Sequence, residues 1–433
     1  DRSMRVLLVG SGGRESALAW ALSRSRRKPT LASAPGNAGI ERHARRIPIA
    51  AEDVEALVSH ARQERYELVV VGPEVPLTRG LADRLRAEGI PVFGPEARAA
   101  EVEGSKAFSK AFMERHRIPT ARSRTFDELS PALQFLDGSD AGYPLVVKAD
   151  GLAAGKGVVI ADDAATARAA ATSMLSGAAF GDAGRRIVVE EMLRGREVSY
   201  FALSDGERFV ELAPCQDYKR VGDGDRGPNT GGMGTYSPSA WLDEKMRDTL
   251  ARSIVAPTIE GLAAEGRPFR GVLFVGLMLT ASGPKVLEYN ARFGDPETQV
   301  LLPRLDGDWL DLLEATARGD LRGARPAWKD DAAVCVVMAS RGYPESSGKG
   351  DPIDGLDAAE ALPGVAVFHA GTARDASGRI VTAGGRVLGV TATGPGIAAA
   401  RARAYEAVSR IRWDGEHHRS DIAADAVSAT RGA

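Results

Sequence analysis

Cysteine is scarce in this chain of 433 residues, and its opposite charges nearly cancel. The two cysteines, Cys215 and Cys335, lie far apart and without metal-type spacing, which argues against a cysteine-bound metal and predicts a reduced, cytosolic setting. Either thiol could be a nucleophile, but a buried small hydrophobic side chain is the favoured interpretation. Lys and Arg total 56 against 58 for Asp and Glu, so the bulk charge does not indicate a nucleic-acid partner.

Long apolar runs are missing as well. No stretch approaches the ~18 residues that a membrane-spanning helix needs, and DRSMRVLLVG at the start lacks the layout of a signal peptide. The six histidines include neither an i,i+4 pair nor HExxH, so no zinc site is expected. With 44% hydrophobic and 26% charged residues, the composition is typical of a soluble globular protein, and the length predicts about three domains.

The first hundred residues alternate apolar strands with helical segments. Strands are expected at 5–9, 30–34, 68–71 and 91–93, and each ends in a loop with glycine: GSGGRE, PGNAG, GPE and a second GPE. This alternation predicts a doubly wound parallel sheet, whose ligands bind beyond the carboxyl ends of its strands.

GSGGRE, at residues 10–15, departs twice from the glycine fingerprint of dinucleotide-binding folds. Glu15 stands where the third glycine belongs, and Pro35 and Gly36 end the second strand where an acid would hold a ribose. A hydride-transferring oxidoreductase is therefore not favoured. Two interpretations stay open: free backbone N–H groups at a helix N-terminus that cradle an anion, and a tight turn without a ligand.

LVVKADGLAAGKGVVI, residues 145–160, predicts two strands joined by a glycine-rich connector. It is not a Walker loop, because Gly157 follows Lys156 where serine or threonine should stand. The pattern suggests a hinged flap over phosphates, with an ordinary hairpin as the alternative. Lys148 favours the flap, because it projects from an apolar strand where an unpaired ammonium would be costly.

Two segments further on carry more candidate polar groups. Glu190 and Glu191 end an apolar strand and Glu197 lies on the next, so one adjacent carboxylate can face a ligand while the other pairs elsewhere. A solvated strand end is the alternative. CQDYKR then leads into a loop at 221–235 with six glycines, and loops of this length are usually functional or disordered.

Residues 286–299 read VLEYNARFGDPETQ. Side chains alternate along a strand, so Glu288, Asn290 and Arg292 are expected on one face. A half-solvated edge strand would explain this pattern. Taken alone, the pattern favours that explanation, and the alternative is an oxygen-ligand site for a hard cation, with Arg292 beside it for an anion.

Several motifs together carry a family resemblance. They occur in this order: GSGGRE, PGNAG, GPEVPL, GSKAFSK, VVKADGLAAGKGV, CQDYKR, GPNTGGMG and LEYNARFGDPETQ. From Met4 to about Ile422 the chain resembles the glycinamide ribonucleotide synthetase (phosphoribosylamine–glycine ligase) family of ATP-grasp enzymes. The resemblance implies that glycine is activated by ATP as glycyl phosphate and joined to 5-phosphoribosylamine, giving glycinamide ribonucleotide, ADP and phosphate in purine biosynthesis. Such chemistry needs positioning and electrostatics rather than a side-chain nucleophile.

The resemblance also assigns nucleotide and metal roles to residues of this sequence. The expected catalytic residues are Lys148, Lys156 and Arg292. Mg or Mn is expected on Glu288 and Asn290. The expected ATP contacts comprise two lysines, the flap, the adenine hinge and a ribose contact: Lys106, Lys148, Gly155, Lys156, Gly157, Glu190, Glu191, Leu193 and Glu197.

Substrates are expected at the N-terminal loops and in the cavity below the flap. The N-terminal loops would receive phosphoribosylamine, and Arg292 would hold the glycine carboxylate or a substrate phosphate. The expected substrate contacts are Gly12, Gly13, Arg14, Glu15, Gly36, Asn37, Pro73, Glu74, Asp217, Lys219, Thr230, Gly231, Gly232 and Arg292.

Two features depart from the family pattern or limit it. Ser16 stands where the family commonly has histidine in GGREHA, which puts any contact by that ring in doubt. Residues 271–279 contain no acid, so water would have to complete a metal's ligand shell.

The expected fold is α/β and α+β in several domains. A doubly wound N-terminal domain (4–104) precedes an ATP-grasp core (105–326) with a small mobile lobe (124–190). A mixed β/α packing domain follows (327–427), with strands expected at 332–338, 366–370 and 379–391. The expected partners are small-molecule substrates, without nucleic acid or membrane, in a monomer or weak oligomer. Another ATP-grasp carboxylate–amine ligase or carboxylase is the enzymatic alternative. A non-catalytic nucleotide-binding module is disfavoured, because Lys148, Glu288 and Asn290 are all present.

Overall fold

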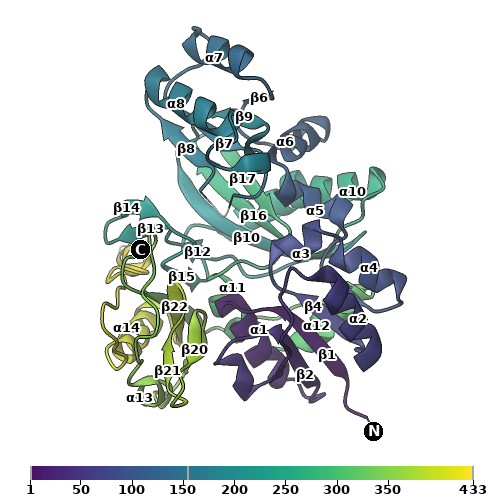
Figure 1. Ribbon diagram of the computed structural model, residues 1–433, viewed down its shortest axis with the longest axis vertical. Coiled ribbons are helices and arrows are strands. Elements are labelled where there is room, and N and C mark those ends of the chain that lie inside the picture. Colours follow the sequence, from purple (N-terminus) through teal and green to yellow (C-terminus); the bar gives the residue numbers. More distant parts are fainter. Residues whose placement is uncertain (1, 154–155, 432–433) are drawn as a thin grey trace.

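The computed structural model describes residues 2–153 and 156–431. Figure 1 shows a small sheet with two helices at the top, a large antiparallel sheet below it, and the N- and C-terminal parts side by side at the bottom. None of the described helices is long and apolar enough to cross a membrane.

The N-terminal sheet is parallel, in the order β3-β2-β1-β4-β5. Its strands are β1 (Arg5–Gly10), β2 (Thr30–Pro35), β3 (Arg45–Arg46), β4 (Leu68–Val71) and β5 (Val92–Phe93). Both faces are covered: Leu7 and Val9 pack in one core and Val6 and Leu8 in the other. This arrangement confirms the predicted doubly wound sheet. Its helices are α1 (Gly13–Ser23), α2 (Val54–Glu64), α3 (Glu74–Thr78), α4 (Leu81–Ala87) and α5 (Ala97–Gly104).

Two antiparallel sheets form the middle of the chain. The small sheet has the order β6-β9-β7-β8, from β6 (Ser123–Phe126), β7 (Leu145–Ala149), β8 (Val158–Ala161) and β9 (Ile187–Glu191). Helices α7 (Leu129–Asp137) and α8 (Ala164–Leu175) cover one of its faces through a separate apolar core. The large sheet has the order β11-β10-β16-β17, from β10 (Arg196–Asp205), β11 (Phe209–Glu211), β16 (Arg270–Thr280) and β17 (Gly283–Asn290). The helices α6 (Lys106–Arg115), α9 (Glu244–Leu250), α10 (Ala256–Ala264), α11 (Thr298–Leu301) and α12 (Trp309–Ala317) complete this part.

The C-terminal sheet, β12-β15-β18-β22-β19, draws strands from two parts of the chain. β12 (Gln216–Asp217) and β15 (Gly234–Ser237) join β18 (Ala332–Ala339), β19 (Val365–His369) and β22 (Arg386–Gly394). Helices α13 (Leu356–Glu360), α14 (Ile397–Val408) and α15 (Ala424–Arg431) follow in the same part. Because β12 and β15 come before residue 327 but belong to the same sheet as strands that come after it, the sheet does not mark a boundary there. The domain boundary expected at residue 327 therefore stays a prediction.

Two expectations about local structure were wrong. Residues 221–235 are not structureless, because β13 (Arg220–Gly222) pairs with β14 (Arg226–Asn229), and the buried Arg419 holds this hairpin through Asp225. The single strand expected over 379–391 is broken into β21 (Ile380–Thr382), which pairs with β20 (Thr372–Arg374), and β22. Both cysteines are buried and free, as predicted.

Candidate active site

Lys148 lies on β7 and is paired inside the small sheet. Its Nζ is 2.9 Å from one carboxylate oxygen of Glu190, and Lys110 Nζ is 3.5 Å from the other. All three side chains are nearly buried, so the carboxylate offsets the cost of removing two ammonium groups from water. Glu190 therefore positions Lys148, a partner that the alternation of the strand did not reveal.

Lys106 is the first residue of α6, and Asp150 holds that end of the helix. One carboxylate oxygen of Asp150 accepts the Ala107 N–H at 2.7 Å and the Ser105 hydroxyl at 3.0 Å. Asp150 follows Lys148 after a single residue, so this contact brings the two lysines together. Sequence reasoning missed Asp150, although its place directly after the strand and the Ser-Lys at the helix start were a signal for capping.

The expected flap begins and ends at anchored points. Gly151 donates its N–H to Ala183 O at 2.9 Å, and Ala149 donates to Gly157 O at 2.8 Å. Lys156 is exposed to solvent. Gly155, expected in the flap, lies outside the described residues.

Glu288 is open to solvent and faces several cations. Burial by surrounding atoms opposes ionisation, but the positive charges of Lys219, Lys148 and Lys106 outweigh it and lower the pKa of Glu288. These lysines come from three separate segments of the chain. The structure therefore brings the predicted phosphate-binding and metal-binding residues to one place, where they form a group that we call the nucleotide face (Lys106, Lys148, Lys219 and Glu288).

Arg292 lies beyond the end of β17 at Asn290, so the alternation of the strand does not place its side chain. Two carboxylates hold its guanidinium instead: Glu74 Oε2 lies 3.1 Å from Nε, and Glu103 Oε2 lies 3.3 Å from Nη2. The other oxygen of Glu103 accepts the Ala291 N–H at 2.7 Å.

Glu103 was absent from the predicted site. Burial, reinforced by Glu74 and opposed by Arg292, raises the pKa of Glu103 to about 7. Its residue type and place at the end of a helix give no sequence signal, because its partners lie almost 190 positions away (188 for Ala291).

Glu288 and Asn290 fit a hard divalent cation. The lowered pKa keeps the Glu288 carboxylate ionised, and the buried Asn290 amide adds a second oxygen donor. Within residues 2–153 and 156–431, no group of three or more acidic, histidine or cysteine side chains is placed to hold a metal alone. The pair therefore suits a cation that is also bound by phosphate oxygens and water.

A second pair of acids lies beside the nucleotide face. Asp217 Oδ1 and Glu297 Oε2 are buried and have no hydrogen-bond partner in the described part of the chain. Burial, together with the charge of Glu297, raises the pKa of Asp217, and burial likewise raises the pKa of Glu297. Such unsatisfied buried oxygens are costly and fit a ligand that donates hydrogen bonds.

The residues that were expected to contact adenine and ribose differ in their surroundings. Glu191 is bonded to Arg122, at 2.9 Å from its backbone N–H, while Leu193 is half-buried. Glu197 Oε2 is 3.8 Å from Lys219 Nζ. Val158 and Ile160, which were not predicted, are exposed apolar side chains on β8, and Val158 pairs across from Lys148. Directly paired residues share a face, so an apolar strip adjoins Lys148.

Two N–H groups at the start of the N-terminal helix, where an anion cradle was one of the two open interpretations, are already bonded to carboxylates of the chain. Glu15 Oε1 accepts the Gly12 N–H at 2.8 Å, and Asp295 Oδ2 accepts the Arg14 N–H at 3.2 Å. The Glu15 carboxylate, also bonded by the Arg14 guanidinium, fills the space left by Gly10 and Gly72. The anion cradle is thus filled from within the chain, and Glu15 organises the loops.

Asn37 is likewise committed to its surroundings. Its amide donates to Ser11 O and His369 O, both at 2.9 Å, and its oxygen accepts the N–H groups of Gly39 and Ile40 at 3.0 Å. Pro73 is the N-cap of α3, directly before Glu74. These loops shape the site through their backbone, since their polar side chains are already paired.

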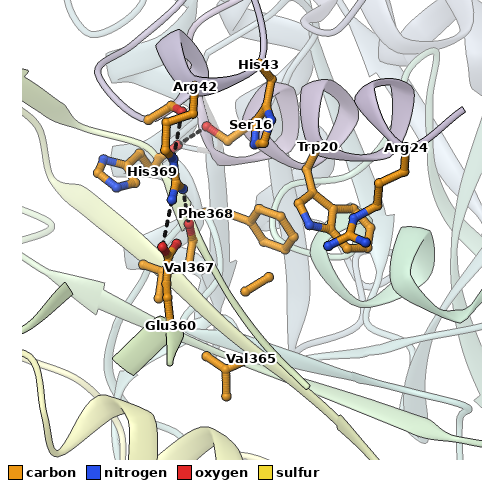
Figure 2. Close-up of a pocket in the computed structure, with 12 residues that line it drawn as sticks. Ser16, Trp20, Arg24, Arg42, His43, Glu360, Val365, Val367, Phe368 and His369 are labelled. Atoms are coloured by element: carbon orange, nitrogen blue, oxygen red, sulfur yellow. Dashed lines mark hydrogen bonds and ion pairs between the residues drawn. The ribbon is translucent and has the colours of Figure 1, made fainter. Parts of the chain in front are cut away.

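Ser16 meets the C-terminal part of the chain. Its hydroxyl donates to His369 O, and the two residues lie at one end of a cavity that Trp20, Arg42 and Phe368 also line (Figure 2). The serine therefore links the N-terminal helix to β19, in the place where the family commonly has histidine.

The loop at Thr230–Gly232 folds against the same acids. The Thr230 hydroxyl donates to Lys219 O at 2.7 Å and accepts the Gly232 N–H at 3.0 Å. A side chain at Gly231 would meet the Arg386 guanidinium, and one at Gly232 would meet Asp217 Oδ1 at 3.0 Å. The glycines thus let the loop lie close to Asp217 and Arg386.

A cavity of about 460 Å³ lies where these loops meet the C-terminal part. The N-terminal segments 11–12 and 35–37 line one side, and residues 370–372 with Arg386 line the other. Asp295 lies between them. The N-terminal loops that were predicted to bind a substrate therefore border a cavity. The C-terminal part of the chain, which was expected only to pack against the rest, forms its other wall.

Known proteins share this sequence and architecture. Models of the phosphoribosylglycinamide synthetase N domain, ATP-grasp (A) domain and C domain match residues 4–103, 104–298 and 333–425. A phosphoribosylamine–glycine ligase of Caulobacter vibrioides is 52% identical over 420 residues, 97% of each chain. One from Xylella fastidiosa is 50% identical over 422 residues, again 97% of each.

Solved structures agree with these matches. The crystal structure of phosphoribosylamine–glycine ligase from Thermotoga maritima has a TM-score of 0.85 at 34% identity, covering 97% of this chain and 100% of that one. Biotin carboxylase from Campylobacter jejuni, with a TM-score of 0.73 at 14% identity over 96% and 93% of the two chains, shares the fold. On these matches, the chain belongs to the phosphoribosylglycinamide synthetase family, with an ATP-grasp domain at its centre.

Proposed function

We propose that this protein uses ATP to join glycine to 5-phosphoribosylamine, giving glycinamide ribonucleotide, ADP and phosphate. The observation that carries the proposal is the nucleotide face, where three lysines converge on one ionised carboxylate. This concentration of positive charge suits a triphosphate, and the unsatisfied acids Asp217 and Glu297 lie next to it. Relatives that are about half identical over almost the whole chain carry the name of this activity.

In this proposal, ATP lies between the two antiparallel sheets. Lys106 and Lys148 contact its phosphates, with Lys156 and the adjoining glycines as the flap over them. Glu190 keeps Lys148 in position through their 2.9 Å ion pair. The exposed Val158 and Ile160 offer the adenine ring an apolar surface beside these lysines. Mg or Mn, held by Glu288 and Asn290 together with phosphate oxygens, would supply positive charge at the transferring phosphoryl group.

Glycine is held at both of its charged ends. Arg292 faces the carboxylate with a planar guanidinium that Glu74 and Glu103 keep in place. Asp217 and Glu297 offer their unpaired buried oxygens to the ammonium group. These contacts orient one carboxylate oxygen of glycine toward the γ-phosphorus. The free energy of binding thus offsets the entropy cost of bringing the two reacting groups together.

Two displacements then follow. A glycine carboxylate oxygen attacks the γ-phosphorus, ADP leaves, and glycyl phosphate is formed. The amine of phosphoribosylamine attacks the carbonyl carbon, the C–O bond to phosphate breaks, and the nitrogen loses a proton. The lysines stabilise charge on the transferring group, and closure of the flap would keep water from the acyl phosphate.

An ADP-release assay with freshly prepared phosphoribosylamine tests this function. Full ADP release should require both glycine and phosphoribosylamine, with one glycinamide ribonucleotide formed per ADP. Release of ADP that is unchanged when either substrate is omitted, or with another amino acid in place of glycine, would contradict the assignment.

A further inference from the structure

The cavity at the meeting of the N-terminal loops and the C-terminal part has a polar wall that the proposed catalytic steps do not use. Small residues line most of it, including Gly12, Gly36 and Gly371, so the cavity has room for a ligand beside its charged side chains. Two arginines, Arg46 and Arg386, also line it. Guanidinium groups commonly bind phosphate esters, because their planar N–H groups match the phosphate oxygens.

Arg386, at the start of β22, is fixed by Asp295. Its Nη1 donates to Asp295 O at 2.8 Å and lies 3.9 Å from the carboxylate of the same residue. Burial would lower the pKa of Arg386, but Asp295 and neighbouring acids outweigh it and raise the value, so the group stays charged. A phosphate would therefore meet a preorganised cation.

The opposite side of the cavity is also held in place. Arg46 donates through Nε to Pro35 O at 3.1 Å and through Nη1 to Glu41 at 3.1 Å. Glu41 accepts a second bond at 3.0 Å, from Arg374 of the C-terminal part. One carboxylate thus joins the two walls. Among the charged residues that line the cavity, Arg46 and Arg386 stand against Asp295. The balance is one positive charge, which favours an anionic ligand.

The cavity also leads toward the acids proposed to hold glycine. Arg386 packs on Gly231, whose neighbour Gly232 approaches Asp217. A ligand with its anionic end at Arg386 would direct its other end toward Asp217 and Glu297. The acceptor amine of the proposed reaction has this shape, with a phosphate at one end of a ribose and an amino group at the other.

We propose that this cavity binds the phosphomonoester of the acceptor substrate and that Arg386, from the C-terminal part of the chain, is its principal charged contact. The inference rests on the proposed function for the identity of the acceptor. It gives the C-terminal part a direct role in substrate recognition.

Calorimetric titration with ribose 5-phosphate, a stable phosphosugar without the amine, tests the inference independently of turnover. The wild-type protein should bind ribose 5-phosphate and not ribose. Arg386→Gln should weaken this binding roughly 10-fold to 100-fold, because one charge-assisted hydrogen-bonding group is lost, and Arg386→Lys should recover part of it. Arg379→Gln, at an exposed arginine paired with Asp375, is the matched control and should bind as the wild type does.

Kinetics separate this inference from the proposed function. In Arg386→Gln, the KM for phosphoribosylamine should rise with the Kd for ribose 5-phosphate, while the KM for ATP stays constant. Unchanged ribose 5-phosphate binding in Arg386→Gln, or equal binding of ribose, would overturn the phosphate site. If the wild type binds ribose 5-phosphate through Arg386 and forms no glycinamide ribonucleotide, the phosphate site stands and the proposed function fails.

Discussion

The nucleotide face and the junction around Asp295 use charge in opposite ways. At the nucleotide face, Lys219, Lys148 and Lys106 share one carboxylate that is open to solvent. At the junction, which we define as Asp295 with Arg14, Gln299 and Arg386, the Asp295 carboxylate is bonded within the protein, while Gln299 Oε1 is buried without a partner in the described part of the chain. Asp295 accepts from the Arg14 N–H at 3.2 Å and from the Gln299 amide at 2.8 Å.

This difference indicates a division of labour. The positive charges gathered at the nucleotide face favour a polyanionic ligand, although Lys148 and Lys219 also pair with Glu190 and Glu197. The junction joins three segments of the chain through Asp295, and it holds Arg386 in place for the phosphate that we propose it to bind. Substitutions at the nucleotide face should therefore mainly affect turnover, and those at the junction should affect stability as well.

The largest effect is expected from Glu288→Ala, which removes the carboxylate shared by the three lysines. Turnover should fall by about 10³-fold, since the proposed metal and its charge at the transferring phosphoryl group are lost. The unfolding free energy should change little. Glu260→Ala, at an exposed residue of α10, is the control, and wild-type turnover of Glu288→Ala would reject the metal assignment.

Asp295→Ala should lower the unfolding free energy by about 3 kcal/mol, because the Arg14 N–H and the Gln299 amide lose their acceptor and Arg386 loses a neighbouring carboxylate. Urea unfolding measures the change. Asp320→Ala, at an exposed acid paired only with the neighbouring Arg322 among the described ion pairs, should be neutral. If Asp295→Ala were as stable as the control and only turnover fell, the proposed division between the two regions would be wrong.

Glu103→Gln tests whether a buried, paired residue can also affect substrate binding, because Glu103 contacts both the Ala291 backbone and the Arg292 guanidinium. The amide retains an acceptor for Ala291 but loses the ion pair, so kcat/KM for glycine should fall by about 30-fold, roughly 2 kcal/mol. The KM for ATP should remain constant. Glu101→Gln on the same helix, where the carboxylate pairs with Arg267 near the surface, is the matched control. An equal rise in both KM values would show a general distortion rather than positioning of Arg292.

The smallest effect concerns His369, buried beside Ser16. Burial, with Arg42 and Arg374 nearby, lowers the pKa of His369 to about 4. An unfolded imidazole takes up its proton near pH 6.5, so stability is retained above that value and lost as the pH falls toward 4. At pH 5.5 this loss should be about 1 kcal/mol relative to pH 7.5, and His369→Gln should abolish that part. An identical pH dependence in the variant would contradict the argument.

Local sequence patterns predicted much of the fold, and they assigned most candidate site residues to the helix, strand or loop in which the structure has them. The strand and loop at 145–160, the carboxylates that end β9 and the acid–amide pair on β17 follow from periodicity and from glycine positions. The alternation does not reach Arg292, because β17 ends at Asn290.

The unpredicted residues share a different property: their partners are distant in sequence. Arg14 and Asp295 are 281 positions apart, and Arg386 bonds a residue 91 positions before it. Nothing in the local pattern of Glu103, Asp295 or Arg386 distinguishes it from a surface charge. Tertiary packing decides which of these groups is buried and paired, and the same packing filled the expected anion cradle with Glu15.

The most direct test of the central claim follows oxygen rather than ADP. Glycine labelled with ¹⁸O in its carboxylate, supplied with ATP and phosphoribosylamine, should transfer one labelled oxygen to each phosphate released, because that oxygen attacks the γ-phosphorus. Product formation with unlabelled phosphate would contradict activation of glycine as an acyl phosphate at the nucleotide face.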